Sequence, residues 1–266
     1  MSGAATHGVS GVLSERHALV TGGGRGIGAA IARALLLQGA RVTVTGRDRE
    51  ALDLAVTQLA ALGEIGGVTM DVASAESVAR AFATARERFG PVAVLVNNAG
   101  QAASAPFLKT SEDVWQQMLA VNLTGSWHCM REALPAMLEA RWGRIVNVAS
   151  TAGLTGYGYV SAYCAAKHGV VGLTRAVALE VAARGVTVNA VCPGYTETDI
   201  VREAVANIME KTGRSEEQAR LELAAANPQR RLVQPEEVAG AVAWLCGPDA
   251  GAMNGQSVAV AGGEIM

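Results

Sequence analysis

The stretch "HALVTGGGRGIGAAIARALLL", residues 17–37, decides the fold. A short apolar run leads directly into a cluster of glycines, and a helical pattern starts immediately after them. Glycine at positions 22, 26 and 28 allows a tight turn, close backbone approach to a pyrophosphate and close packing of the helix on the strand. The unpaired N–H groups at the helix N-terminus then face the phosphates. The stretch therefore predicts a dinucleotide-binding strand–turn–helix unit.

The rest of the chain repeats this alternation of apolar runs and helical patterns. The apolar runs cover residues 17–22, 41–46, 66–71, 92–100, 143–150, 186–194 and 256–263. They are continuous rather than alternating, which is typical of strands buried on both faces. We expect an α/β protein with a single-domain Rossmann fold. Its doubly wound parallel sheet would have about seven strands with helices on both faces.

We find no repeat, low-complexity tract or linker in the 266 residues, so we expect one domain over 14–266 after a flexible leader at 1–13. Residues 199–232 contain two amphipathic helical patterns where a short connection would suffice. An insertion after the C-terminal end of a strand lies beside the ligand crevice of such sheets. We therefore predict a substrate lid at 199–232.

Two interpretations of the lid remain open. An apolar face could shield an acyl chain, while cations could meet an acidic carrier or coenzyme A phosphates. Alternatively, the lid is a solvated amphipathic helix pair whose glutamates neutralise those cations. The apolar face comprises Ile200, Val201, Val205, Ile208 and Met209, and the cations are Arg202, Lys211, Arg214, Arg220, Arg230 and Arg231.

The composition excludes several functional classes. A net charge of −2 gives no basic footprint for nucleic acid. No stretch approaches the roughly 20 apolar residues that span a bilayer, and the first residues do not resemble a signal peptide. The four cysteines are far apart, which indicates reduced core thiols in a cytoplasmic protein. The four histidines have no metal-ligand spacing, so we expect no metal site.

The end of the second strand favours NADP(H) over NAD(H). A carboxylate there bonds a ribose 2′-hydroxyl, whereas an arginine accommodates a 2′-phosphate. This sequence has Gly46 followed by Arg47, and Arg25 offers a second cation. Asp48 keeps NAD(H) possible, because a small loop shift would bring it toward the ribose. Asp71, after the third strand, either bonds the adenine amino group or caps the next helix.

Ketone reduction needs a positioned acid, because hydride adds to carbon while a proton adds to oxygen. Of the four tyrosines, only Tyr163 has a lysine four residues later, Lys167. Residues at this spacing are neighbours on a helix, and a nearby cation favours the phenolate and lowers the pKa of a tyrosine. Oxidised nicotinamide would add to the effect. The pair is thus a candidate acid–base group.

Six motifs in order carry a family resemblance: "TGGGRGIG" (21–28), "NNAG" (97–100), "VNLTG" (121–125), "IVNVAS" (145–150), "YCAAK" (163–167) and "NAVCPGYTET" (189–198). From about residue 14 to 263 the chain resembles the short-chain dehydrogenase/reductases. It looks most like their 3-oxoacyl-thioester (ACP or CoA) reductases and polyketide ketoreductases.

The resemblance implies a catalytic set. Ser150 would bond the substrate carbonyl, Lys167 would also bond the nicotinamide ribose, and Asn122 would hold a water near Lys167 to complete a proton relay. Capping for Ser150 and a structural role for Asn98 remain open. Resemblance and residue pattern together assign to the cofactor Gly22, Gly24, Arg25, Gly26, Ile27, Gly28, Arg47, Asp71, Val72, Asn98, Ala99, Gly100, Tyr163, Lys167, Pro193, Gly194, Thr196 and Thr198.

Three functions compete. The leading hypothesis is an NADPH-dependent reductase of a 3-oxoacyl thioester or similar ketone. The second is an NAD-dependent dehydrogenase of a 3-hydroxyacyl-CoA or secondary alcohol. The third is a regulatory protein that binds nucleotide without turnover, although the complete catalytic set argues against it. The helix expected at about 161–183 is apolar nearly all round, which together with the resemblance suggests a homotetramer, with a dimer as second choice.

Overall fold

The central layer of the molecule is one parallel sheet. The structure, a computed structural model, describes residues 11–266 apart from the side chain of Ile200. The strands are β1 (His17–Thr21), β2 (Arg41–Gly46), β3 (Ile65–Thr69), β4 (Val92–Asn97), β5 (Gly143–Val148), β6 (Val186–Pro193) and β7 (Ser257–Val260). They pair in the order β3-β2-β1-β4-β5-β6-β7, and every pair is parallel. The predicted fold class is confirmed.

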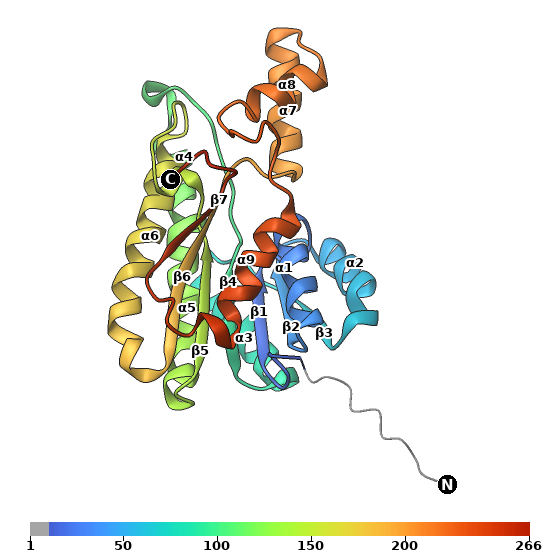
Figure 1. Cartoon of the computed structure of the whole chain (residues 1–266), viewed down its shortest axis with the longest axis vertical. Helices are drawn as coiled ribbons and strands as arrows, with labels where there is room; N and C mark the ends of the chain where they lie inside the picture. The colour runs from blue at the N-terminus through green and yellow to red at the C-terminus, as the bar shows by residue number, and fades with distance from the viewer. Residues whose placement is uncertain (1–10) are drawn as a thin grey trace.

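Helices cover both faces of this sheet (Figure 1). They are α1 (Gly26–Leu37), α2 (Arg49–Leu59), α3 (Ala75–Phe89), α4 (Glu112–Leu119), α5 (Gly125–Glu139), α6 (Ser161–Val181), α7 (Asp199–Thr212), α8 (Glu216–Leu223) and α9 (Pro235–Cys246). One core packs α1, α2 and α9 on the sheet, and the other packs α3, α5 and α6. Successive residues of β1 pack into opposite cores, since Ala18 and Val20 lie in the first core and Leu19 lies in the second.

A buried polar chain joins the central strands to α6. The side-chain amide of Asn97 on β4 donates to the side-chain oxygen of Asn147 on β5 at 2.8 Å. Asn147 in turn donates to the Thr174 hydroxyl on α6 at 2.8 Å. All three side chains are buried, where an unpaired polar group would be costly. The chain therefore holds α6 at a defined position against the sheet.

Two strands are shorter in the structure than the sequence predicted. The strand predicted at 92–100 ends at Asn97, and the one predicted at 256–263 covers only Ser257–Val260. After β4, the N–H groups of Asn98 and Ala99 donate to the Thr21 hydroxyl at 3.0 and 2.9 Å instead of to a neighbouring strand. Side chains at the sheet edge thus replace the backbone pairing that the apolar pattern suggested.

The domain begins earlier than predicted. Leu13 is fully buried in the core, and its N–H donates to the carbonyl of Gln38 at 2.9 Å. The backbone of Gly11 lies so close that a Cβ there would be 2.1 Å from the same carbonyl oxygen. The predicted leader, 1–13, therefore ends too late, because Gly11 and Leu13 already pack on the domain. Its residues 1–10 lie outside the described residues.

The remaining class predictions concern thiols, metals and membranes. All four cysteines are free, and burial raises the pKa of Cys129 and Cys246 to about 12. Within residues 11–266, no cluster of His, Cys, Asp and Glu is arranged to hold a metal ion. In the same range, no helix combines the length and apolar character needed to cross a membrane.

Candidate active site

Polar side chains gather beyond the carboxyl ends of the central strands. The strand order reverses between β1 and β4, which is where open α/β sheets bind ligands. Ser150 follows β5, Tyr163 and Lys167 lie in the first two turns of α6, and Asn122 lies between α4 and α5. Ser150, Tyr163 and Lys167 lie together, and Asn122 lies across Gly100 from Lys167.

Lys167 is buried and lies beside Tyr163. Its ammonium donates to the carbonyl oxygen of Val148, the last residue of β5, at 2.8 Å. The same nitrogen lies 5.7 Å from the centroid of the Tyr163 ring. One of its three N–H donors is therefore used by the protein, which leaves two for other partners.

Ser150 has the capping role that the sequence left open, and it lies beside Tyr163. Its hydroxyl accepts a hydrogen bond from the Ala152 N–H at 3.1 Å and so caps the helical turn Thr151–Gly153. The same side chain lies close enough to the Tyr163 phenol to lower its pKa. Capping thus fixes the hydroxyl next to the tyrosine.

The electrostatics differ from the sequence expectation. Burial raises the pKa of the Tyr163 phenol, and the nearby Ser150 side chain is the main influence that lowers it. Burial also lowers the pKa of Lys167 to about 8. The net pKa of Tyr163 therefore lies above its ordinary value, because burial outweighs any attraction between the phenolate and the Lys167 ammonium. Burial removes hydration from both charged forms, and the ammonium does not offset this loss.

Asn122 lies in a π-helical turn, Ala120–Thr124, between α4 and α5. Such turns are rare and frequently occur at functional sites. The Asn122 amide donates to the carbonyls of Met118 and Gln101, both at 3.0 Å. A Cβ on Gly100 would lie 2.8 Å from Asn122 Oδ1 and 3.7 Å from Lys167 Nζ. Asn122 and Lys167 therefore border one small space that Gly100 keeps open.

The glycine loop fits a dinucleotide. Helix α1 has no side-chain cap and no acidic residue in its first turn, so its N-terminal N–H groups remain available to phosphate. A Cβ on Gly28 would lie 2.1 Å from the Gly22 carbonyl oxygen, so the turn requires glycine there. Gly22 and Gly26 have φ of +63° and +54°, a region that favours glycine.

Asn98 has a structural role. Its amide donates to the carbonyls of Thr21 and Gly22, at 2.9 and 3.1 Å. The side chain thereby holds the glycine turn against the end of β4. Ala99, the next residue, packs against the same turn: a Cβ on Gly22 would lie 3.0 Å from its Cα.

The end of β2 fits the predicted preference for a 2′-phosphate. Asp48, the residue that kept NAD(H) open, accepts a hydrogen bond from the Ala51 N–H at 3.1 Å and caps α2. Arg47 is exposed and forms no ion pair within the described part of the chain. Arg25 instead lies 3.5 Å from Asp199 at the start of α7, so its charge is partly neutralised.

Asp71 and Val72 follow β3. Asp71 accepts from the Ala73 N–H at 3.0 Å, while Ser74 is the residue that caps α3. The capping role considered for Asp71 therefore belongs to Ser74. Val72 is buried and packs against Gly125, where a Cβ would lie 2.8 Å from its side chain.

The segment after β6 joins the lid to the glycine loop. Thr196 is buried, and its hydroxyl donates to the Gly194 carbonyl at 2.9 Å. Thr198 Cγ2 would lie 3.4 Å from a Cβ on Gly26. Thr196 also pairs with Val233, where the lid returns to the domain. The structure thus brings Thr198 against the glycine loop, while Thr196 lies at the base of the lid.

The lid consists of α7, α8 and the loop that returns to α9, and it projects beyond the sheet (Figure 1). Val201 and Val205, which one interpretation placed against an acyl chain, are buried against lid residues such as Ala219 and Leu232. Their apolar face therefore packs the lid on itself. Met209 remains exposed.

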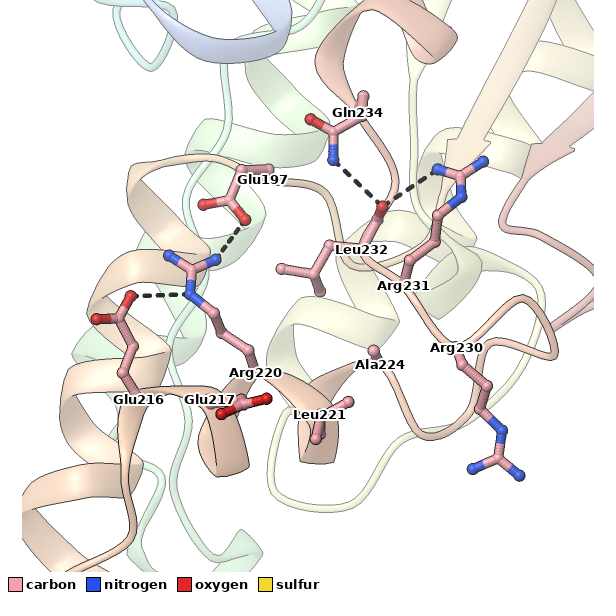
Figure 2. Close-up of a pocket in the computed structure, with 10 residues that line it drawn as sticks. All are labelled: Glu197, Glu216, Glu217, Arg220, Leu221, Ala224, Arg230, Arg231, Leu232 and Gln234. Atoms are coloured by element: carbon pink, nitrogen blue, oxygen red, sulfur yellow. Dashed lines mark hydrogen bonds and ion pairs between the residues drawn. The ribbon is translucent and has the colours of Figure 1, made fainter.

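A groove of about 540 Å³ on the lid is lined by charged residues of both signs (Figure 2). Arg220 lies between Glu216, 2.9 Å away, and Glu197, 2.5 Å away. Arg231 pairs with Glu237 at 2.6 Å. The further pairs are Arg202 with Asp199 and Arg214 with Glu222. Because carboxylates neutralise most lid arginines, the structure favours a solvated helix pair over an anion-docking surface.

Sequence reasoning missed three residues of this region. Thr21 organises the loop after β4, Tyr157 hydrogen-bonds to Thr151 at 2.9 Å, and Glu264 accepts from the Tyr157 hydroxyl. The position of Thr21 directly before the glycines was a usable signal. Glu264 offered no such signal, because it lies 107 residues from its partner.

Comparisons with known proteins agree with this geometry. The family model described as "short chain dehydrogenase" matches residues 16–208. A Streptomyces coelicolor protein, provisionally named a ketoacyl reductase, is 44% identical over 92% of this chain and 95% of its own. A D-beta-hydroxybutyrate dehydrogenase of Rhizobium meliloti is 38% identical over 92% of this chain and 97% of its own. The crystal structure of a single-substitution variant of the actinorhodin polyketide ketoreductase with NADPH has a TM-score of 0.90 and 42% identity, covering 94% of this chain and 97% of that one.

Proposed function

Because the chain belongs to the short-chain dehydrogenase family, and is an oxidoreductase of the CH–OH/C=O couple, we propose that it reduces a 3-oxoacyl thioester with NADPH. The observation that carries the proposal is the grouping of three side chains: the Lys167 ammonium lies 5.7 Å from the Tyr163 ring, and the Ser150 hydroxyl is close enough to lower the pKa of that tyrosine. Two similar proteins support the substrate class, one named for ketoacyl reduction and one a polyketide ketoreductase described with NADPH.

NADPH would supply the hydride that adds to the carbonyl carbon. The chain supplies the proton, because the raised pKa keeps Tyr163 protonated at neutral pH and its O–H can be transferred to the carbonyl oxygen. The Ser150 hydroxyl is a second donor to the same oxygen, so two donors stabilise its developing charge. The Lys167 cation stabilises the phenolate left behind. Asn122 holds the water through which the phenol regains its proton.

We expect a catalytic preference for NADPH that depends on Arg47. Replacing Arg47 with Asp should lower the ratio of kcat/KM with NADPH to kcat/KM with NADH by about tenfold or more, because a carboxylate repels the 2′-phosphate. Steady-state kinetics with both nucleotides measure the ratio. Arg33→Asp makes the same charge change at another exposed position and should leave the ratio as it is. A wild-type ratio below one contradicts the preference.

A ketone panel tests the function itself. NADPH and NADH are each assayed by absorbance against acetoacetyl-CoA, longer 3-oxoacyl thioesters, and simple cyclic and aromatic ketones. We expect the highest kcat/KM for a 3-oxoacyl thioester with NADPH. Higher values for simple ketones would overturn the thioester assignment. Bound nucleotide without turnover of any ketone would instead favour a regulatory protein.

One relative favours a second candidate. The Rhizobium meliloti protein is named for the oxidation of a hydroxy acid, D-beta-hydroxybutyrate, and is 38% identical. A dehydrogenase of a 3-hydroxyacyl-CoA or secondary alcohol would use the same catalytic residues in reverse, with Tyr163 as the base. Faster oxidation of 3-hydroxybutyrate with NAD than reduction of any thioester with NADPH would select this alternative.

We also propose that the protein is a homotetramer. The outer sides of α5 and α6 expose Trp127 and Leu179, which are 41% and 83% accessible. A shallow apolar hollow formed by Leu123, Trp127 and Leu173 lies on this surface. A second copy of the chain would cover it, since apolar helix faces are usually covered. Light scattering should give four times the monomer mass, with a dimer as second choice, and a stable monomer would exclude both.

We propose a cytoplasmic location. The four cysteines are free, and three of them are buried in the core. Proteins of oxidising compartments tend instead to pair their cysteines in disulfides. Fractionation of the source cells would test this, and recovery outside the cytoplasm would contradict it.

A further inference from the structure

The C-terminal segment places Glu264 beside the loops that follow β5 and β6. After β7, the chain bends through Gly262 and Gly263, whose φ angles are +61° and +94°. A Cβ on Gly262 would lie 2.2 Å from Asn227 Oδ1, so a larger residue does not fit this turn. The Glu264 N–H then donates to the Ala261 carbonyl at 3.1 Å. The bend is therefore a defined structure that sets the position of the glutamate.

The Glu264 carboxylate lies between two active-site loops. Oε1 accepts a hydrogen bond from the Tyr157 hydroxyl. The oxygen of that hydroxyl is 2.9 Å from the hydroxyl of Thr151, the residue after Ser150. An ionised carboxylate can only accept, so the phenol donates to Glu264 and accepts from Thr151. Oε2 lies 2.8 Å from where a Cβ on Gly194 would be. One carboxylate thus contacts the segments that follow β5 and β6.

The negative charge of Glu264 has no cationic partner. No Lys or Arg within residues 11–266 forms an ion pair with it. Its charge helps raise the pKa of Tyr157 and of Tyr195, in both cases after the larger effect of burial. Tyr195 in turn lies close enough to Tyr163 to affect its pKa. The charge of Glu264 therefore acts on two tyrosines beside the catalytic residues, Tyr157 and Tyr195.

We propose that Glu264 is a specificity-determining residue, which repels ketones that carry a free carboxylate and so favours uncharged ketones such as 3-oxoacyl esters and thioesters. This inference rests on the proposed function, because it names the substrate class of the same site. A free 3-oxo acid would bring a second negative charge into a partly buried site where the first is not neutralised. Like charges in such a site disfavour binding, whereas an ester or thioester of the same acid avoids the repulsion.

The test compares two substrates that differ in this charge, acetoacetate and ethyl acetoacetate. The quantity measured is kcat/KM with NADPH for acetoacetate divided by that for the ester. E264Q should raise this ratio by about tenfold, because it removes the charge and keeps the shape of the side chain. E264D keeps the charge and should keep the wild-type ratio. Glu64→Gln makes the same charge change at an exposed position before β3 and should also leave it unchanged.

Further outcomes separate charge from packing. Tyr157→Phe removes the hydrogen bond to Glu264 but keeps its charge, so the ratio should stay low. A rise in Tyr157→Phe as large as in E264Q would overturn the inference, because packing would then set the ratio. An unchanged ratio in E264Q, with the ester still reduced, would overturn the inference alone. Failure of the wild-type protein to reduce any ketone would overturn the proposed function and this inference with it.

Discussion

Replacing Tyr163 with Phe is expected to lower kcat for ketone reduction by about 10³-fold or more. The change removes the O–H that donates the proton and keeps the ring that packs beside Lys167, 5.7 Å from its ammonium. The absorbance of NADPH during reduction of acetoacetyl-CoA gives kcat. NADPH fluorescence gives the dissociation constant, which should change little because the ring remains in place.

Tyr159→Phe is the matched control for this experiment. Tyr159 lies on the loop before α6, and its side chain is exposed. Loss of its hydroxyl should leave kcat close to the wild-type value. Retention of most activity in Tyr163→Phe would contradict the assignment of Tyr163 as the proton donor.

Replacing Lys167 with Met is expected to raise the free energy of unfolding by about 1–3 kcal/mol at pH 7 while removing most activity. Burial lowers the pKa of this lysine to about 8, which shows that its charge is unfavourable in the folded protein. Methionine has a similar length and no charge, although it leaves the Val148 carbonyl without its partner. Urea denaturation measures the gain in stability, and NADPH oxidation measures the loss of turnover.

The gain should depend on pH in a defined direction. Below pH 8 the wild-type lysine is protonated in both states, and the full cost of its burial is present. Between pH 8 and the ordinary value of 10.5, the unfolded chain binds more protons than the folded one, so wild-type stability rises. The advantage of Lys167→Met should therefore shrink across this window. Lys211→Met, at an exposed lid position, should show no such pattern. A less stable Lys167→Met protein at pH 7 would contradict the prediction.

The catalytic pair was predictable because it depends on local geometry. Residues four apart on a helix are neighbours wherever that helix packs, so Tyr163 and Lys167 were matched from spacing alone. The glycine loop was equally local, since a turn that excludes a Cβ at position 28 selects glycine directly. The ends of the strands were less predictable, because the apolar pattern continues beyond the last backbone pair.

The pKa values were not predictable in the same way. Spacing showed a cation beside a phenol but not how much water either group loses on folding. That loss depends on distant segments, such as β5, whose Val148 carbonyl receives the lysine, and the Ser150 loop beside the tyrosine. Desolvation reversed the expected direction for Tyr163. The sequence also left two interpretations of the lid open, and only the packing of Val201 and Val205 against lid residues chose between them.

The sequence by itself determined the parallel sheet, the glycine loop and the Tyr163–Lys167 pair, because periodicity, turn chemistry and helical spacing act within a few residues. Only the tertiary structure decided the ionisation of that pair, the self-packing of the lid and the position of Glu264. Desolvation and unpaired charge depend on which remote segments meet in space, and Glu264 meets Tyr157 across 107 residues of chain. The charge that we expect to select the substrate therefore comes from a segment beyond β7, far in sequence from the catalytic residues.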